Sequence, residues 1–131
     1  MKVRKIVPTQ RPWSGLMGYS RAVRVGPLVE VAGTTSVSPE GEVLHPGDAY
    51  LQTREALGII TAALAEVGAQ PTDVVRTRVV VTDVNLWEEV ARAHGEVFAD
   101  ILPASSMVEV ARLLVPGLLI EIEATAYVAD E

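Results

Sequence analysis

The sequence contains no cysteine and only two histidines among its 131 residues. The absence of cysteine excludes disulfide bonds, thiolate metal ligands and thiol nucleophiles, and it is typical of proteins in a reducing compartment. His45 and His94 do not form a metal-ligand pattern with nearby carboxylates. We therefore expect no metal site.

Long hydrophobic runs are also absent. No stretch approaches the roughly 20 apolar residues of a membrane helix, and the basic start at residues 1–5 is not followed by an apolar segment of signal-peptide length. The net charge of −6 disfavours electrostatic binding to the phosphate backbone of nucleic acids. We expect a cytoplasmic protein with no membrane attachment, for which nucleic acid is a disfavoured partner.

The length leaves room for one domain, residues 1–131, with a single core and no separate cofactor-binding module. We therefore expect no organic cofactor. Hydrophobic residues make up 49% of the chain, which is high for a domain that can bury only part of its own apolar surface. We therefore expect several copies of the chain to associate and bury the remaining apolar surface between them.

Short Pro and Gly turns separate periodic segments that predict strands and helices. The predicted strands cover residues 3–7, 19–25, 28–34, 74–82, 103–111 and 118–124. Apolar residues at steps of three and four predict one helix over 49–67 and a second between a cap at Asp83 or Asn85 and Pro103. The predicted order is β-β-β-α-β-α-β-β.

Two carboxylates interrupt the aliphatic sequence of the last predicted strand. Alternation places Leu119, Glu121, Glu123, Thr125 and Tyr127 on one face and Ile120, Ile122, Ala124, Ala126 and Val128 on the other. Ionised groups are costly to bury. The glutamate face is therefore expected either to meet water or to line a polar cleft between subunits.

Right-handed crossovers through the two helices predict a two-layer α+β sandwich with both helices on one face and parallel neighbouring strands. In the strand over 74–82, Val75, Val79 and Val81 are predicted to face the helices. The helix-free face is then predicted to carry Arg76, Arg78, Glu109, Glu121 and Glu123. Such a charged face favours contact with another subunit.

Several segments occur together in an order and spacing that are typical of one family. They are Gly18-Tyr19-Ser20-Arg21-Ala22-Val23, residues 29–34, residues 73–83, Glu96-Val97-Phe98, Pro103-Ala104 and residues 120–126. Over nearly its whole length the chain resembles the Rid superfamily, small trimeric imine/enamine deaminases also described as YjgF-like or translation-inhibitor proteins. The resemblance implies a chorismate-mutase-like α+β sandwich, a homotrimer and a ligand cleft at each subunit interface.

The family's reaction is hydrolysis of a 2-imino acid, or its enamine tautomer, to the 2-keto acid and ammonia. By the resemblance, Glu121 occupies the position of the water-binding acid, Gly33 that of a substrate-facing backbone group, and Tyr19 that of a ring lining the cleft. Thr34, which follows Gly33, is included among the expected binding residues. These positions imply a site for a small-molecule metabolite.

Other positions depart from the family pattern. Ser105 stands where the deaminases carry an arginine that clamps the substrate carboxylate, and Ala91 stands where they carry an asparagine. Met107 occupies a position that is small in the deaminases, which narrows the cleft or makes it more apolar. Ser105 and Met107 remain candidate binding residues. The chain thus resembles a divergent subgroup whose substrate differs from the usual short 2-imino acids.

Arg78 is a candidate replacement cation because it lies on the predicted helix-free face. The alternative is that Arg78 pairs with Glu109, Glu121 or Glu123 as a structural link. The function has two corresponding interpretations, which leave open whether the chain is an enzyme. It hydrolyses an imine or enamine through Glu121, or it is a non-catalytic trimer that binds a metabolite or a partner in the same cleft. A ribonuclease or translation-inhibitor activity is disfavoured by the acidic charge.

Overall fold

The computed structural model describes residues 3–129, so the first two residues of the basic start lie outside the described part. The elements are β1 (Arg4–Val7), α1 (Ser14–Met17), β2 (Ala22–Val25), β3 (Leu28–Thr34), α2 (Ala49–Glu66), β4 (Val74–Val81), α3 (Trp87–Phe98), β5 (Ala104–Glu109) and β6 (Ile120–Tyr127). Short 3₁₀ turns at Pro71–Asp73 and Val84–Leu86 precede β4 and α3. The predicted order is confirmed, with the one-turn helix α1 as an unpredicted addition.

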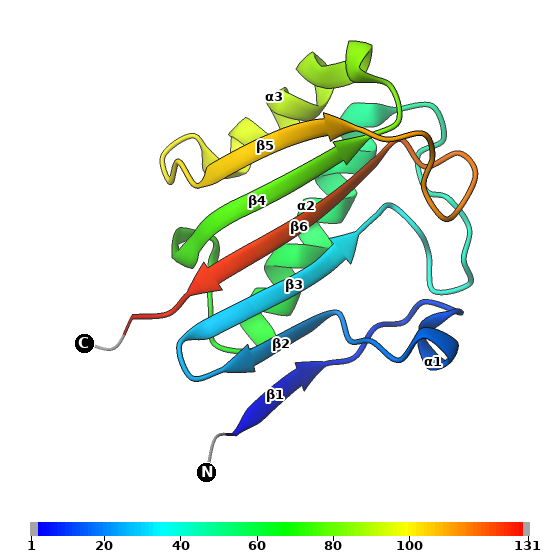
Figure 1. The fold of residues 1–131 in the computed structure, drawn as a ribbon. Coiled ribbons are helices and arrows are strands. Elements are labelled where there is room, and N and C mark those ends of the chain that lie inside the picture. Colours follow the sequence, from blue (N-terminus) through cyan, green and yellow to red (C-terminus); the bar gives the residue numbers. More distant parts are fainter. Residues whose placement is uncertain (1–2, 130–131) are drawn as a thin grey trace.

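The strands form one six-stranded sheet in the order β1-β2-β3-β6-β4-β5, and α2 and α3 lie against the same face of it (Figure 1). β4 and β5 are parallel, whereas the other neighbouring strands are antiparallel. This arrangement confirms the predicted two-layer α+β sandwich. No helix within residues 3–129 has the length and apolar character needed to cross a membrane.

One prediction about the crossovers is wrong. β3 and β4 are joined through α2 but are not neighbours, because β6 lies between them and pairs with both. The physical reason is burial. Ile120 and Ile122 are both 0% exposed, which requires a central strand beneath the helices, whereas most of β5 is exposed and suits an edge.

The register of β4 is irregular in a way that simple alternation does not reveal. Its pairing with β6 shifts between Val74 and Arg76, so Val74 is buried in the core and Val75 is 51% exposed. The prediction that Val75 faces the helices is therefore wrong. Glu109 also leaves the predicted face, because it pairs in parallel with the buried Val81, and its Oε1 accepts a hydrogen bond of 2.9 Å from the Val84 N–H.

Helix α2 begins after Asp48, whose carboxylate accepts a hydrogen bond of 2.9 Å from the Leu51 N–H. Its apolar stripe, which includes Ile60 and Leu64, belongs to the same buried cluster as Ile120 and Ile122 of β6. Burying one such aliphatic side chain contributes about 1.5–3 kcal/mol. This packing fixes which face of β6 is turned toward α2. The opposite face of β6, with its glutamates, must then point away from the helices.

We expect Ile122→Ala to lower the free energy of unfolding by about 2–5 kcal/mol, because it removes a fully buried side chain and leaves a cavity under α2. Urea denaturation followed by circular dichroism would measure the change. Leu16→Ala is the matched control, since Leu16 is 97% exposed and a surface change of this kind costs within about 0.5 kcal/mol. Equal stability of the two variants would contradict the assignment of the core.

Candidate functional site

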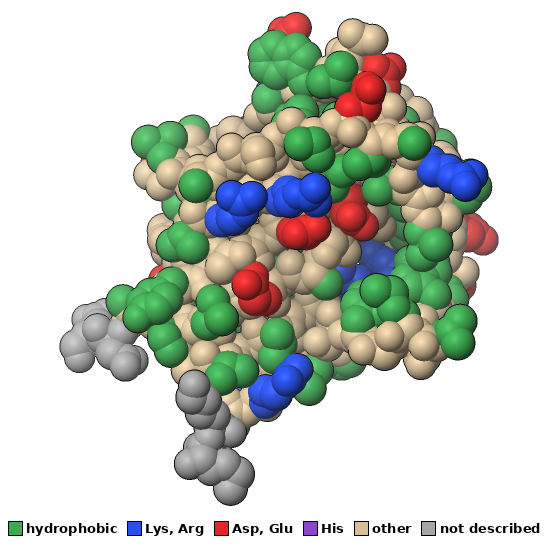
Figure 2. Space-filling model, viewed as in Figure 1, with side chains coloured by type: hydrophobic (Ala, Val, Ile, Leu, Met, Phe, Trp, Pro, Cys, Tyr) green, Lys and Arg blue, Asp and Glu red, His purple; other side chains and the backbone are tan. Residues whose placement is uncertain are grey.

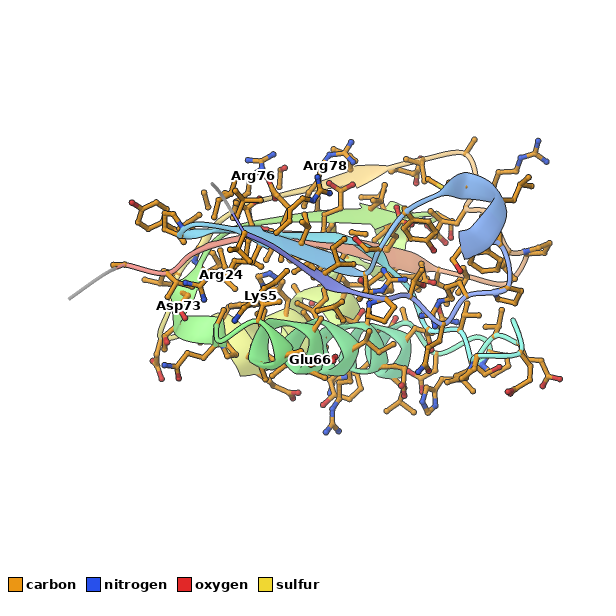
Figure 3. All side chains as sticks on the ribbon, turned by 90° about the horizontal axis from the view of Figure 1, so that it is seen from below. Lys5, Arg24, Glu66, Asp73, Arg76 and Arg78 are labelled. Carbon is orange, nitrogen blue, oxygen red and sulfur yellow. The ribbon has the colours of Figure 1, made fainter. Side chains whose placement is uncertain are left out.

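The alternation of β6 places two carboxylates on the helix-free face of the sheet. Ile120, Ile122, Ala124 and Ala126 are buried, whereas Glu121 and Glu123 are partly exposed. Basic and acidic side chains gather near the middle of this face (Figure 2), and Arg76 and Arg78 point away from the helices (Figure 3). The predicted two-faced character of this strand is confirmed.

The Glu121 carboxyl group lies directly against Gly33 of β3. A β-carbon added at Gly33 would lie 2.6 Å from the Glu121 Cδ and 2.9 Å from each of its carboxyl oxygens, which is too close unless the carboxyl group moves aside. The pairing of β3 with β6 is irregular here, between Val31 and Thr34. The structure thus brings together Gly33 and Glu121, two of the residues predicted from the family positions.

Arg21 is buried beneath this part of β3. Its Nη1 donates to the Gly33 carbonyl oxygen at 2.8 Å and to the Thr34 Oγ1 at 3.0 Å, and its Nη2 donates to the Thr9 Oγ1 at 3.2 Å. Thr34 is 0% exposed, and its hydroxyl donates to the Ala32 carbonyl oxygen at 2.7 Å. Thr34 therefore supports the wall of the site from within the protein.

A second buried arginine lies beside the first. The Arg11 Nη2 donates to the Thr35 carbonyl oxygen at 3.0 Å. Sequence reasoning missed both Arg11 and Arg21. Arg21 offered one signal, since it precedes the alternating β2 strand at a position predicted to belong to that strand, but Arg11 lies in an irregular segment where alternation says nothing about burial.

These residues line a cavity of about 320 Å³. Its charged walls are Arg11, Arg21, Glu121 and Glu123, and its apolar walls include Trp13, Tyr19, Leu114 and Leu118. The Trp13 Nε1 donates to the Tyr19 hydroxyl oxygen at 2.9 Å, which fixes the two rings relative to each other. A concave site with apolar walls and a few convergent polar groups is the usual form of a small-molecule site.

Burial raises the pKa of Glu121, and the charge of Glu123 raises it further, whereas Arg21 and Arg78 act in the opposite direction. Desolvation is the larger of the two causes because the carboxylate loses water that the cavity walls replace only partly. A carboxyl group with a raised pKa can both accept and return a proton closer to neutral pH. Glu121 therefore has the properties of a general acid and base.

Arg78 lies on the same face but contacts the other glutamate. Its Nη1 is 3.4 Å from the Glu123 Oε2, and both side chains are partly exposed. This arrangement corresponds to the ion-pair alternative considered for Arg78, with Glu123 as the partner. Exposed pairs of this kind contribute little to stability, on the order of 0–1 kcal/mol.

Ser105 and Met107 of β5 are not brought to the cavity within one chain. The Thr77 Oγ1 donates to the Ser105 Oγ at 2.7 Å and lies 2.9 Å from the His94 Nε2 on α3, so Ser105 faces the helix side of an exposed edge strand. Met107 packs against the core. Burial lowers the pKa of His94, which favours its neutral form in this chain of hydrogen bonds.

The part of the chain that the structure describes, residues 3–129, contains no group of three or more His, Asp or Glu side chains arranged to hold a metal ion. The cavity also lacks a glycine-rich phosphate loop at a helix N-terminus. Its donors are guanidinium, indole and phenol groups, and its acceptors are carboxyl groups. These groups suit a small organic ligand with polar ends.

The sheet, the helices on one face and the glutamate-lined cavity together define a small α+β protein with a partly charged cavity on its helix-free side. The pattern of the family described as Endoribonuclease L-PSP matches residues 9–128, and the chain belongs to this family, which is also known as the YjgF or Rid family.

Relatives of known structure or name agree with this assignment. A member of the YjgF/YER057c/UK114 family from Mycobacterium tuberculosis is 49% identical, with a TM-score of 0.87 over 96% of this chain and 100% of that one. The 2-iminobutanoate/2-iminopropanoate deaminase of Rattus norvegicus is 32% identical over 95% of this chain and 90% of its own length. Escherichia coli TdcF, solved with bound serine, is 30% identical, with a TM-score of 0.79 over 95% and 99% of the two chains.

We expect Glu121→Gln to stabilise the protein in alkaline but not in acid solution. Because the folded-state pKa is raised above the ordinary value of 4.5, the unfolded chain releases this proton first as the pH rises. The contribution of Glu121 to stability therefore falls between pH 4.5 and the raised pKa and stays low above it. Melting temperatures at about pH 4 and about pH 8 would measure this difference.

Glu30→Gln is the control for this experiment, because Glu30 is an exposed carboxylate on the neighbouring strand. Its difference from the wild type at each pH is the baseline for the loss of one glutamate charge on this face. A Glu121→Gln variant that melts below the wild type at high pH would contradict the assignment of Glu121 as a desolvated carboxyl group.

We expect Gly33→Ala to push the Glu121 carboxyl group away from β3, because the new methyl group would occupy its place. The free energy of unfolding should change by less than about 1 kcal/mol, since only the end of a flexible side chain must move. The pKa of Glu121, measured by ¹³C NMR of its carboxyl carbon, should fall toward its ordinary value. Gly58→Ala is the control, because nothing lies within 4 Å of a β-carbon there. An unchanged pKa in Gly33→Ala would show that the contact does not hold the carboxyl group.

Proposed function

We propose that this protein hydrolyses a reactive imine or enamine to a keto compound and ammonia, with Glu121 as the catalytic residue. The observation that supports this proposal best is the partly buried Glu121 carboxyl group, with its raised pKa, held against Gly33 in a cavity. The deaminase name of the Rattus norvegicus relative supports the reaction class.

The chemistry needs a proton acceptor that later becomes a donor. The substrate enters as the iminium, protonated at nitrogen. Glu121 takes a proton from a water molecule as the water oxygen bonds to the iminium carbon, which gives a neutral carbinolamine. Glu121 then returns that proton to the amino group, the C–N bond breaks to release ammonia, and the hydroxyl group forms the carbonyl group and loses its proton to solvent. A carboxyl group whose pKa lies above its ordinary value suits both steps.

The other predicted residues take supporting roles in this proposal. The Tyr19 ring forms one wall for a planar substrate, the Gly33 backbone lies beside the reacting group, and Thr34 supports that backbone from below. Arg78 forms an ion pair with Glu123, and its guanidinium group can contact the ligand only when that ion pair is broken. The substrate is not one of the usual short 2-imino acids, because Ser105 replaces the family's clamping arginine.

We further propose that the protein is a homotrimer. Ser105 and Met107 lie on an edge strand away from the cavity of their own chain, so they act on a ligand only if β5 of one copy borders the cavity of the next. The charged and partly apolar sheet face that no helix covers supports such packing (Figure 2).

A non-catalytic metabolite-binding trimer is the second candidate, and the bound serine of TdcF supports small-molecule binding in this family. That alternative predicts an Arg78–Glu121 pair that neutralises the acid. Within residues 3–129 the ion pair of Arg78 is instead with Glu123, which leaves Glu121 available for chemistry. An endoribonuclease activity, which the family description names, is disfavoured by the net charge of −6.

The test generates several 2-imino acids in situ with an amino-acid oxidase and follows the imine that semicarbazide can still trap. We expect the protein to accelerate imine loss and Glu121→Gln to reduce that acceleration by at least about a hundredfold, since general acid–base catalysis contributes about that much. Glu30→Gln should retain activity, because Glu30 does not line the cavity of Glu121.

Size-exclusion chromatography with light scattering separates the two candidate functions. Loss of turnover in Glu121→Gln with an unchanged oligomeric state supports catalysis. No acceleration by the wild type with small, aromatic or basic imino acids would reject the deaminase proposal in favour of the binding protein.

A further inference from the structure

Arg11 and Arg21 are buried cations that have no carboxylate partner. They are 8% and 5% exposed, and their hydrogen bonds go to neutral carbonyl and hydroxyl oxygens. Among the described residues, no carboxylate oxygen lies within 4.0 Å of either guanidinium group. Buried charges in proteins are normally paired with an opposite charge. A counter-charge is therefore missing from this site.

The carboxylates around the two arginines are engaged elsewhere. Glu55 lines a neighbouring cavity with both arginines and acts on Arg11 electrostatically, but it lies beyond ion-pair distance of either guanidinium group, and its Oε1 is 3.4 Å from the His45 Nε2. Glu123 pairs with Arg78. Apart from Glu123, whose charge is paired with Arg78, the charged groups that line the cavity are the guanidinium groups of Arg11 and Arg21 and the carboxyl group of Glu121. One positive charge is in excess even when Glu121 is fully ionised.

Arg11 has donors that point to open space. Every buried side-chain nitrogen or oxygen atom of the described residues has a hydrogen-bond partner. The Nε and Nη1 of Arg11 have no such partner, so they must retain accessible surface. Arg11 lines the Glu121 cavity and also a neighbouring cavity that contains Glu55. Arg21 differs, because its two terminal nitrogens are occupied by β3 and Thr9.

Electrostatics agree with the geometry. Burial lowers the pKa of Arg11, and the neighbouring charge of Arg21 lowers it further. A guanidinium group remains protonated at physiological pH in spite of such a shift. The pair therefore stays positively charged, and an anion bound beside it would relieve both the lost hydration and the mutual repulsion.

We infer that this cavity binds the carboxylate of a small monoanionic ligand through Arg11, while Arg21 acts as a positioning residue that holds the floor of the site. The planar guanidinium fork of Arg11 suits a carboxylate. Glu121 and Glu123 line the same cavity and would repel a multiply charged anion, whereas Trp13, Tyr19, Leu114 and Leu118 suit an apolar body. The inference deepens the proposed function, because it assigns the cation of the same site to Arg11.

The test measures binding directly, with phenylacetate as the probe and phenylacetamide as its neutral counterpart. Isothermal titration calorimetry on the wild type should give a Kd at least about tenfold lower for the acid than for the amide, and Arg11→Gln should raise the Kd of the acid by at least about tenfold. Lys5→Gln is the control, since it removes a positive charge that does not line this cavity. Inorganic phosphate should not displace phenylacetate.

The indole N–H of Trp13 provides a second readout, because its proton resonance should shift on addition of phenylacetate to the wild type. If Arg11→Gln does not fold, Arg11→Lys replaces it, and the loss of the planar fork should still weaken binding. Absence of phenylacetate binding by the wild type, equal binding of acid and amide, displacement by phosphate, or a folded Arg11 variant with unchanged affinity would each overturn the inference.

The outcomes separate this inference from the proposed function. Imine hydrolysis that depends on Glu121 but proceeds with an unchanged KM in Arg11→Gln would support the reaction and reject Arg11 as its carboxylate site. Phenylacetate binding that depends on Arg11, without hydrolysis of any imine, would support the anion site and reject the deaminase.

Discussion

The close approach of the Glu121 carboxyl group to Gly33, in the space that a β-carbon would occupy, joins the fold of this protein to its candidate site. It requires β6 to lie beside β3, and it requires a residue without a β-carbon at position 33. Once that contact is made, the carboxyl group is partly removed from water and its pKa rises. The Arg21 guanidinium group donates a hydrogen bond to the carbonyl oxygen of the same Gly33. Gly33 therefore contacts both the acidic and a basic side chain of the site.

The position of β6 follows from the two different rows of side chains that it carries. Its aliphatic row is fully buried beneath α2, which is possible only for a central strand. Its second row then projects glutamates from the middle of the helix-free face, where neighbouring strands shield them. The energy gained by burying isoleucines on one side therefore offsets the cost of holding carboxylates in a restricted environment on the other.

The departures from the family pattern gain a physical meaning in this structure. Ser105 does not simply lack a charge. It takes part in a chain of hydrogen bonds with Thr77 and His94 on the helix side of β5. Positive charge is instead concentrated beneath β3, where Arg11 and Arg21 lie beside the same cavity as Glu121. In our proposal the ligand carboxylate is therefore held from the β3 side of the cavity rather than from β5.

Short-range patterns in the sequence determined the two long helices, most of the strands and the two faces of β6. The roles of Tyr19, Gly33 and Glu121 were predicted through the family resemblance and remain predictions. These features depend on spacing along the chain and on the chemistry of single residues. Tertiary structure alone decided that β6 separates β3 from β4, that a bulge exposes Val75, that Arg78 meets Glu123, and that Arg11 and Arg21 are buried side by side. Each of these depends on which distant segments come into contact, and burial of a polar side chain is a property of its surroundings that no local pattern records.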